Sequence, residues 1–126
     1  MKEKTKEIWV GENRFYLDED NILHITAASE QNRKAANILK EATDTFKSRV
    51  ARKMNIFLDL NKVRKTSPEA RKIGQEMLED EEIGKVAFFG LHPVARVVAA
   101  FIIGVSKKKN LRFFKTEEEA LTWLKE

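Results

Sequence analysis

The order of apolar runs and helical patterns along the chain is the feature that most constrains its fold. Short strand-like apolar runs occur at 56–58, 86–89 and 111–114. Each run lies between two segments whose apolar residues recur every three or four positions. Such alternation is typical of parallel strands that are joined by crossover helices. We therefore predict an α/β fold with a mainly parallel sheet and about four flanking helices.

The first part of the chain has a different pattern. Two extended runs, 14–18 and 22–27, are separated by a polar turn, and apolar and polar residues alternate along the second run. A period of two residues indicates half-buried strands, and a short polar turn favours antiparallel pairing. We therefore predict an antiparallel hairpin at the amino-terminal side of the sheet, with 8–10 as a further short strand.

Capping residues give the expected starts of the helices. Ser29, Ser67 and Thr116 each precede a helical pattern and can accept a hydrogen bond from a free N–H of the first turn. Pro93 suits the first turn of the third helix, where a missing N–H costs nothing. Thr116 and Glu119 together form a capping box for the last helix.

Length and composition predict one domain. The 126 residues are 42% hydrophobic, which suffices for a single core. We find no linker or repeat, so we assign 8–126 to one domain and 1–7 to a flexible or edge segment. We expect no secretion signal, because the stretch MKEKTKE is charged and has no apolar h-region behind it. The longest apolar run, 97–105, is too short to cross a bilayer. We therefore expect a cytoplasmic protein without a transmembrane segment.

Several classes of function find no support in the sequence. The absence of cysteine excludes disulfides, thiol catalysis and thiolate metal sites. The 24 lysines and arginines are mixed with 20 acidic residues, whereas nucleic-acid binding favours cations gathered on one face. His24 and His92 suggest neither a metal site nor a catalytic triad. We predict no nucleic-acid partner, no metal, no cofactor and no enzymatic activity.

The third predicted helix, 94–105, is apolar almost all round, with Arg96 as its only charge. A helix that is apolar on every face needs burial on every face, whereas a helix on the surface of a small domain buries only one. Three interpretations remain: a homodimer contact, a pocket for an acyl chain or other apolar ligand, or central burial under Trp9 and Phe15. The residues of this candidate apolar ligand or dimer surface are Phe88, Val97, Phe101, Ile102 and Val105.

The chain resembles the STAS superfamily (sulfate transporter and anti-sigma factor antagonist), in its SpoIIAA-like branch, which is related to CRAL-TRIO lipid-transfer domains. The stretches that carry the resemblance are FLDLNKV with SPEARK, KVAFFG, PVARVVAAFIIG and above all LRFFKTEEEALTWL. The resemblance extends over 8–126 in the order of the elements. It implies a single STAS-like domain that acts by binding a protein, and it also permits an apolar ligand.

The resemblance also directs attention to the loop after the central strand. In anti-sigma factor antagonists this loop carries an aspartate–serine pair, and a partner kinase phosphorylates the serine. Here Ser67 is nearest in position, after Lys65 and Thr66, but the preceding aspartate is missing. Ser67 is explained as a helix cap, and we retain Thr66 and Ser67 as a candidate phospho-switch.

Two further candidate sites come from the residues themselves. A candidate docking face follows the central strand and consists of Asp59, Lys62, Arg64 and Lys65. Asp59 could bind a ligand at the end of the strand or form a salt bridge with Lys62 or Arg64.

The second candidate is an anion site at the start of the third helix. Gly90, His92 and Arg96 lie where free N–H groups and the helix dipole favour a negative charge.

The sequence thus predicts a non-enzymatic regulatory or protein-interaction module of the STAS type, in homodimeric form. The alternative is a module that binds or senses a small apolar ligand, such as a lipid or acyl chain, in a pocket lined by the third helix.

Overall fold

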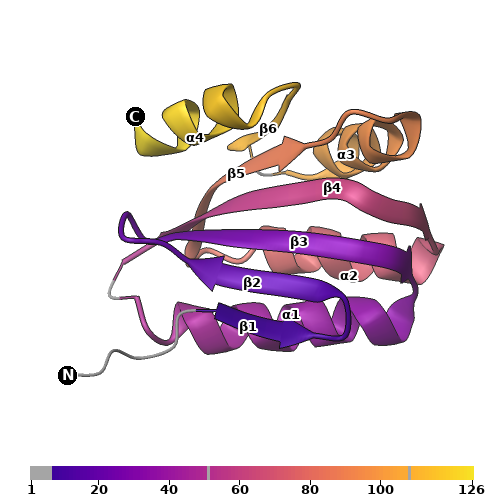
Figure 1. The fold of residues 1–126 in the computed structure, drawn as a ribbon, viewed down its shortest axis with the longest axis horizontal. Helices are drawn as coiled ribbons and strands as arrows, with labels where there is room; N and C mark the ends of the chain where they lie inside the picture. Colours follow the sequence, from indigo (N-terminus) through magenta and orange to yellow (C-terminus); the bar gives the residue numbers. More distant parts are fainter. Residues whose placement is uncertain (1–6, 51, 108) are drawn as a thin grey trace.

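The computed structural model describes residues 7–50, 52–107 and 109–126 (Figure 1). Of the predicted flexible or edge segment 1–7, residues 1–6 lie outside the described residues, and Glu7 begins an edge strand. The chain forms six strands and four helices in these residues, in the order β1 (Glu7–Val10), β2 (Asn13–Leu17), β3 (Ile22–Gln31), α1 (Arg33–Lys47), β4 (Met54–Thr66), α2 (Pro68–Leu78), β5 (Ile83–Phe89), α3 (Pro93–Val105), β6 (Leu111–Phe114) and α4 (Glu117–Lys125).

The six strands form one mixed sheet in which the spatial order is the sequence order. β1, β2 and β3 pair antiparallel, whereas β3 to β6 pair parallel. This arrangement confirms the predicted fold class, including the antiparallel amino-terminal hairpin. The two parts differ because a tight turn can join antiparallel strands, whereas each parallel pair needs a helix to return the chain.

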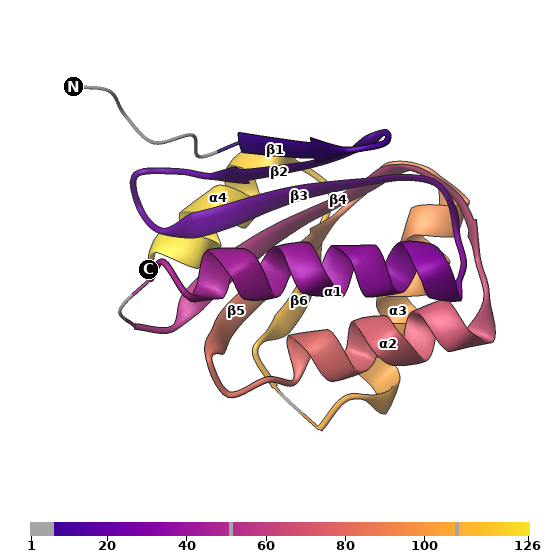
Figure 2. The same ribbon diagram turned by 90° about the horizontal axis from the view of Figure 1, so that it is seen from below.

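Three helices cover one face of the sheet. α1, α2 and α3 each connect two neighbouring parallel strands, and right-handed crossovers that advance in one direction place their helices on the same face. Figure 2 shows α1 and α2 side by side on this face, with α3 next to α2. The main core lies beneath them and includes the fully buried Phe15, Phe46 and Phe88. Since the strand order never reverses, the parallel strands have no topological switch point where a ligand crevice would open.

α4 lies on the opposite face of the sheet (Figure 2). Its Ala120 and Leu124 are buried against Ile22, Phe57 and Ala87 in a second, smaller core. Thr116 caps this helix, and its hydroxyl oxygen accepts from the N–H of Glu119 at 3.1 Å. The helix therefore begins at the capping residue that the sequence indicated.

Boundaries around β3 and β4 differ from the prediction, and β3 extends to Gln31 instead of ending at 27. Ser29 does not cap α1 but lies in β3, in the left-handed region with φ of 63°, beside a register shift in the pairing with β4. Asn32 is the N-cap instead, since its side chain accepts from the N–H of Ala35 at 2.9 Å. β4 is also much longer than the predicted 56–58, because the extended β3 supplies a hydrogen-bonding partner for it as far as Thr66.

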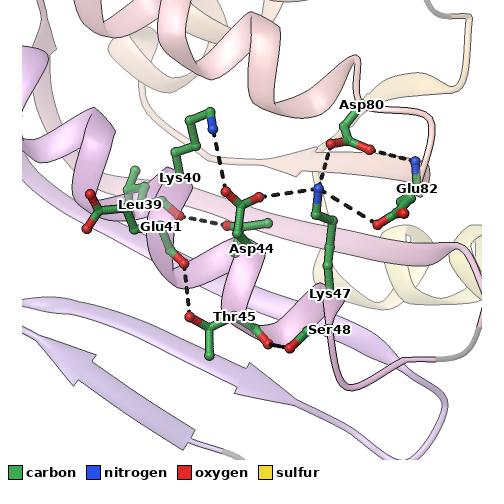
Figure 3. Close-up of polar contacts among 10 residues, drawn as sticks. Leu39, Lys40, Glu41, Asp44, Thr45, Lys47, Ser48, Asp80 and Glu82 are labelled. Carbon is green, nitrogen blue, oxygen red and sulfur yellow. Dashed lines mark hydrogen bonds and ion pairs between the residues drawn. The ribbon is translucent and has the colours of Figure 1, made fainter.

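Ionic contacts join α1 to the segment after α2, at the end of the sheet where β4 and β5 begin. Lys47 lies 2.5 Å from Asp80 and 3.3 Å from Asp44, and Glu82 is within 4.0 Å (Figure 3). The Lys47 side chain is only 13% exposed. Burial by itself would lower the pKa of Lys47, but the hydrogen bonds and negative charges of Asp80 and Asp44 outweigh it and raise the pKa above 10.5.

Candidate functional site

Ser67 is the N-cap of α2. Its hydroxyl oxygen accepts from the N–H of Ala70 at 3.0 Å, and Pro68 occupies the first turn. Its own N–H donates to the Gln31 carbonyl at 2.9 Å, so the residue is also held to the end of β3. The predicted capping role of Ser67 is thus confirmed, and the residue stands between the end of β4 and the start of α2.

The cations of the candidate docking face lie on a strand and not on a loop. Lys62 and Lys65 pair in register with Ala28 and Glu30 of β3, and β4 continues to Thr66. Lys62, Arg64 and Lys65 are exposed. Lys65 also forms an exposed ion pair with Glu30 at 3.2 Å. The positions of these side chains are therefore set by the sheet.

The outer side of α3 is apolar and exposed. Val97 is 66% exposed, and Phe101 and Val105 are each 44% exposed. These residues follow one another every four positions, so they form a single stripe along the helix. The surplus of apolar residues that the sequence indicated is thus real, and it faces outward.

A groove joins this stripe to the end of β4. Arg71 extends from α2 across the groove, with its guanidinium 4.9 Å from the centre of the Phe101 ring. Cations therefore border one side of the groove and apolar side chains form the other. The residues that line it are Arg64, Lys65, Thr66, Arg71, Pro93, Val94, Val97, Val98 and Phe101. We call this feature the α3 groove.

Other residues of the predicted docking face and anion site have structural partners. The carboxylate of Asp59 accepts two hydrogen bonds from Asn61, each at 2.9 Å, and is not paired with Lys62 or Arg64 among the described residues. The Asn61 side chain accepts from the N–H of Leu91 at 2.8 Å. Asn61 thus joins β4 to the turn before α3.

His92 contributes to the same connection. Its Nε2 lies 2.7 Å from the carbonyl oxygen of Asn61. A carbonyl only accepts, so this nitrogen carries the proton and donates. Gly90 is buried, and a Cβ added there would lie 2.2 Å from Cβ of Ala95. Arg96 is exposed on α3. The geometry explains Gly90 and His92 by packing and hydrogen bonding.

The five residues of the predicted apolar surface are divided between two places. Phe88 and Ile102 are buried in the main core, whereas Val97, Phe101 and Val105 are exposed. Trp9, proposed as a cover for α3, lies in β1 at the opposite edge of the sheet, while α3 packs near β4 and β6. It is 58% exposed and does not cover the helix.

Several residues at the site carried no signal in the sequence. Arg71 looked like one more cation on a helix, and its place in the groove depends on how α2 and α3 pack. Asn61 is one polar residue among many, and its role depends on the turn that β5 and α3 bring beside it. Gln31 falls within the helix predicted to begin at Ser29, whereas it belongs to β3. A sequence pattern could have found none of these three.

Two absences follow for the described part of the chain. No group of three His, Asp or Glu residues in it could hold a metal ion. Within the same residues, none of the helices has both the length and the apolar character needed to cross a membrane.

Comparison with solved structures identifies the fold. An anti-sigma factor antagonist from Mycobacterium paratuberculosis matches with a TM-score of 0.66 and 17% identity, over 90% of this chain and 93% of that chain. The Bacillus cell fate determinant SpoIIAA in its phosphorylated form matches with a TM-score of 0.63 and 15% identity, over 89% and 98%. A Shewanella loihica protein of the DUF3478 family, described as having a SpoIIAA-like fold, matches with a TM-score of 0.62 and 12% identity, over 94% and 89%.

These likenesses confirm the predicted SpoIIAA-like fold, and at such identities they establish the fold alone. No curated protein matches the sequence. A family model does match, over residues 15–126, which is nearly the whole domain. The chain therefore belongs to the family described as domain of unknown function DUF7793.

Proposed function

We propose that this domain is a non-enzymatic regulatory module that works by binding a protein partner through the α3 groove. The observation that carries the proposal is the groove itself, where the exposed Val97 and Phe101 lie beside Arg64, Lys65 and Arg71. An exposed apolar patch rimmed by polar groups is typical of protein interaction sites. The SpoIIAA-like fold supports the regulatory role, since two of the solved relatives are described as an anti-sigma factor antagonist and a cell fate determinant.

The charges of the groove define the chemistry of the partner. Arg64 and Lys65 are exposed and Arg71 crosses the groove, so an occupying segment would face positive charge on one side. The stripe on α3 requires apolar side chains on the other side. The partner that fits is an acidic segment with regularly spaced apolar residues, such as an amphipathic helix. Electrostatic attraction would speed its association and give it specificity.

Three predictions from the sequence belong to this proposal. Thr66 lines the groove, and Ser67 follows it at the cap of α2, so phosphate on either residue would add about −1.5 to −2 charges next to the docking surface. An acidic partner would then be repelled.

A homodimer would use the exposed apolar stripe on α3, so it would compete with the partner for that surface. We also propose that the module is cytoplasmic.

The experiment is quantitative capture of partners from the native host. Tagged wild-type protein, Lys65→Glu and Val97→Lys are crosslinked in cells, purified and compared by mass spectrometry. We expect one or a few proteins with acidic amphipathic segments to be enriched on the wild type and lost from both variants. Because Lys65 and Val97 are exposed, neither change disturbs the core.

Lys53→Glu is the matched control, since Lys53 is exposed just before β4 begins, whereas Lys65 lies at the other end of that strand. It makes the same charge change as Lys65→Glu. If Lys53→Glu loses the same proteins, binding depends on net charge and not on the groove. If Lys65→Glu and Val97→Lys keep every partner of the wild type, the α3 groove is not the docking site.

A further inference from the structure

β4 extends well beyond its neighbour β5. Its last pair with β5 joins Asp59 to Phe89, whereas its pairing with β3 continues to Thr66. The turn before α3 covers Asn61. Within the described residues no other strand lies beside β4 on this side, since the sheet has the single order β1 to β6. Residues 62–66 therefore have a free strand edge on the side that faces away from β3.

The backbone of Thr66 is directed toward this free edge. Thr66 lies opposite Gln31, whose carbonyl accepts from the N–H of the next residue, Ser67, at 2.9 Å. In a parallel pair, the residue opposite such an acceptor points its own N–H and C=O to the other side. The Thr66 carbonyl has this direction, since it accepts from Nη1 of Arg71 at 3.2 Å. A side chain of α2 thus bonds where a neighbouring strand would otherwise bond.

The α3 groove lies along the same edge. Its lining combines Arg64, Lys65 and Thr66 of β4 with residues of α3 that include Val97 and Phe101. In Figure 1, α3 follows the arrowhead of β5 and lies next to the second half of β4. A strand placed beside this part of β4 would extend the sheet over α3. Its side chains would point alternately toward α3 and toward the open face of the sheet.

We propose that the occupant of the α3 groove binds as an added β-strand, which pairs with the free edge of β4. This inference rests on the docking function proposed above, and it specifies the conformation of the partner. The partner segment is short and extended, with apolar residues that alternate with acidic ones. Its apolar side chains contact Val97 and Phe101, and its carboxylates lie near Arg64 and Lys65. In this mode of recognition, main-chain hydrogen bonds give affinity and alternate side chains give specificity.

The charges of the edge select the strand that can be added. Lys62, Arg64 and Lys65 are exposed. Cations on a free edge oppose pairing with the same edge of a second copy, whereas they attract an acidic strand. In the pairing with β3, a register shift separates Val63 from Lys65. Such an irregularity interrupts the ladder, so the added strand is short.

The test begins with two acidic peptides of equal length and composition, both made of leucine and glutamate. The two residues alternate in the first peptide, and they follow helical spacing in the second. Each peptide is titrated into the full chain, and the backbone amides are followed by NMR. We expect the alternating peptide to give saturable shifts at Lys65 and Thr66. It should bind about tenfold more tightly than the second peptide, because it gains main-chain hydrogen bonds.

Methylation of the peptide nitrogens distinguishes a strand from other bound forms. In an added strand, alternate N–H groups face β4 and the others face away from it. Methyl groups on one alternate set should therefore abolish binding of the alternating peptide, and methyl groups on the other set should leave it. A bound helix would be disrupted by either set, since its N–H groups bond within the helix.

Thr66→Pro and Thr66→Val provide a matched pair of variants of the domain. Both remove the hydroxyl group that Arg71 contacts, but only proline also removes the N–H at the free edge. Proline is tolerated in a strand where the N–H is not used within the sheet, so both variants should fold. We expect the alternating peptide to bind Thr66→Pro about tenfold more weakly than Thr66→Val, because one hydrogen bond is lost. Should Thr66→Pro unfold, the two methylated peptides decide the question.

Equal binding to Thr66→Pro and Thr66→Val, or equal effects of the two methylated sets, would overturn the strand proposal. If the peptide with helical spacing binds more tightly and is weakened by Lys65→Glu, the groove docks a helix. The docking function would then stand and the strand proposal would fail. If neither peptide binds, or if Lys65→Glu and Val97→Lys weaken neither peptide, the docking function fails as well.

Discussion

Ser67 is both the N-cap of α2 and a candidate phosphorylation site, and these two roles depend on different neighbours. The cap needs only the hydroxyl oxygen and a free N–H in the first turn of α2, and both are in place. A phosphate would add charge beside Arg64, Lys65 and Arg71, which the groove brings near the same end of α2. The cap follows from the sequence neighbours of Ser67, whereas the phosphate proposal depends on residues distant in sequence.

We expect Ser67→Ala to lower the free energy of unfolding by about 1 kcal/mol, because the Ala70 N–H loses its acceptor. Ser67→Asp should retain most of the stability, since aspartate also caps helices. Urea denaturation of the three proteins measures the difference. Equal stability of Ser67→Ala and the wild type would contradict the capping role.

Lys47 leads to a prediction about pH. Its pKa is raised in the folded protein, since Asp80 and Asp44 outweigh the opposing effect of burial. A raised pKa means that the contribution to stability is complete below the unfolded value of 10.5 and is lost as the pH rises through the folded value. The stability of the wild type should therefore decrease at alkaline pH by an amount that Lys47→Met does not show.

At neutral pH we expect Lys47→Met to cost about 1 kcal/mol, which is the upper range for partly exposed ion pairs. Lys40→Met is the control, because Lys40 is more exposed and lies 3.5 Å from Asp44. Thermal unfolding at a series of pH values measures both effects. If the stability of the wild type and of Lys47→Met changes with pH in the same way, Lys47 is not the source of the alkaline loss of stability.

At the scale of elements, α3 packs closely against the end of β5, and this packing explains why residue 90, predicted as part of an anion site, is a glycine. Gly90 ends the strand and lies against Ala95 in the first turns of α3. Asn61 and His92 hold the same turn to β4. The turn is thus fixed from two sides, which sets where the exposed stripe of α3 faces.

We expect Gly90→Ala to destabilise the domain by about 1–3 kcal/mol, because its Cβ would clash with Cβ of Ala95 and the helix would have to move. Gly104→Ala should leave the stability unchanged or raise it by about 1 kcal/mol, since the site is open and alanine favours helix. Chemical denaturation distinguishes the two. A neutral Gly90→Ala would show that the turn adapts easily.

At the scale of the whole molecule, the open question is what covers the stripe on α3. A second copy would bring its own Arg64, Lys65 and Arg96 toward those of the first copy. The apolar contact would then be opposed by repulsion between like charges. An acidic partner meets the same surface with attraction. The predicted homodimer and the proposed partner complex should therefore respond to salt in opposite directions.

We expect the predicted homodimer to be weak and to bind more tightly as the salt concentration increases from about 0.01 M to about 1 M. The Debye length then decreases from roughly 30 Å to 3 Å, so the repulsion between the like charges of the two copies is screened. Sedimentation equilibrium measures it, with Phe101→Lys as a variant that should remain monomeric. Dimerisation that weakens with salt, or that persists in Phe101→Lys, would place the interface elsewhere.

The sequence by itself determined the elements and their order. Alternation of apolar runs with helical patterns, the caps Ser67 and Thr116, and the surplus apolar surface of α3 are local properties, and each was predicted correctly. The prediction that Ser29 caps α1 was wrong because β3 continues along β4 as far as Gln31, so that Asn32 becomes the N-cap.

Only the tertiary structure decided which residues meet. Arg71 joins Lys65 and Phe101 in one groove, although these residues lie on three different elements. Such meetings depend on the register of β3 against β4 and on the packing of α2 beside α3. Strand register and helix packing are set by burial and pairing between residues that are distant in sequence, so a local pattern of residues cannot predict them.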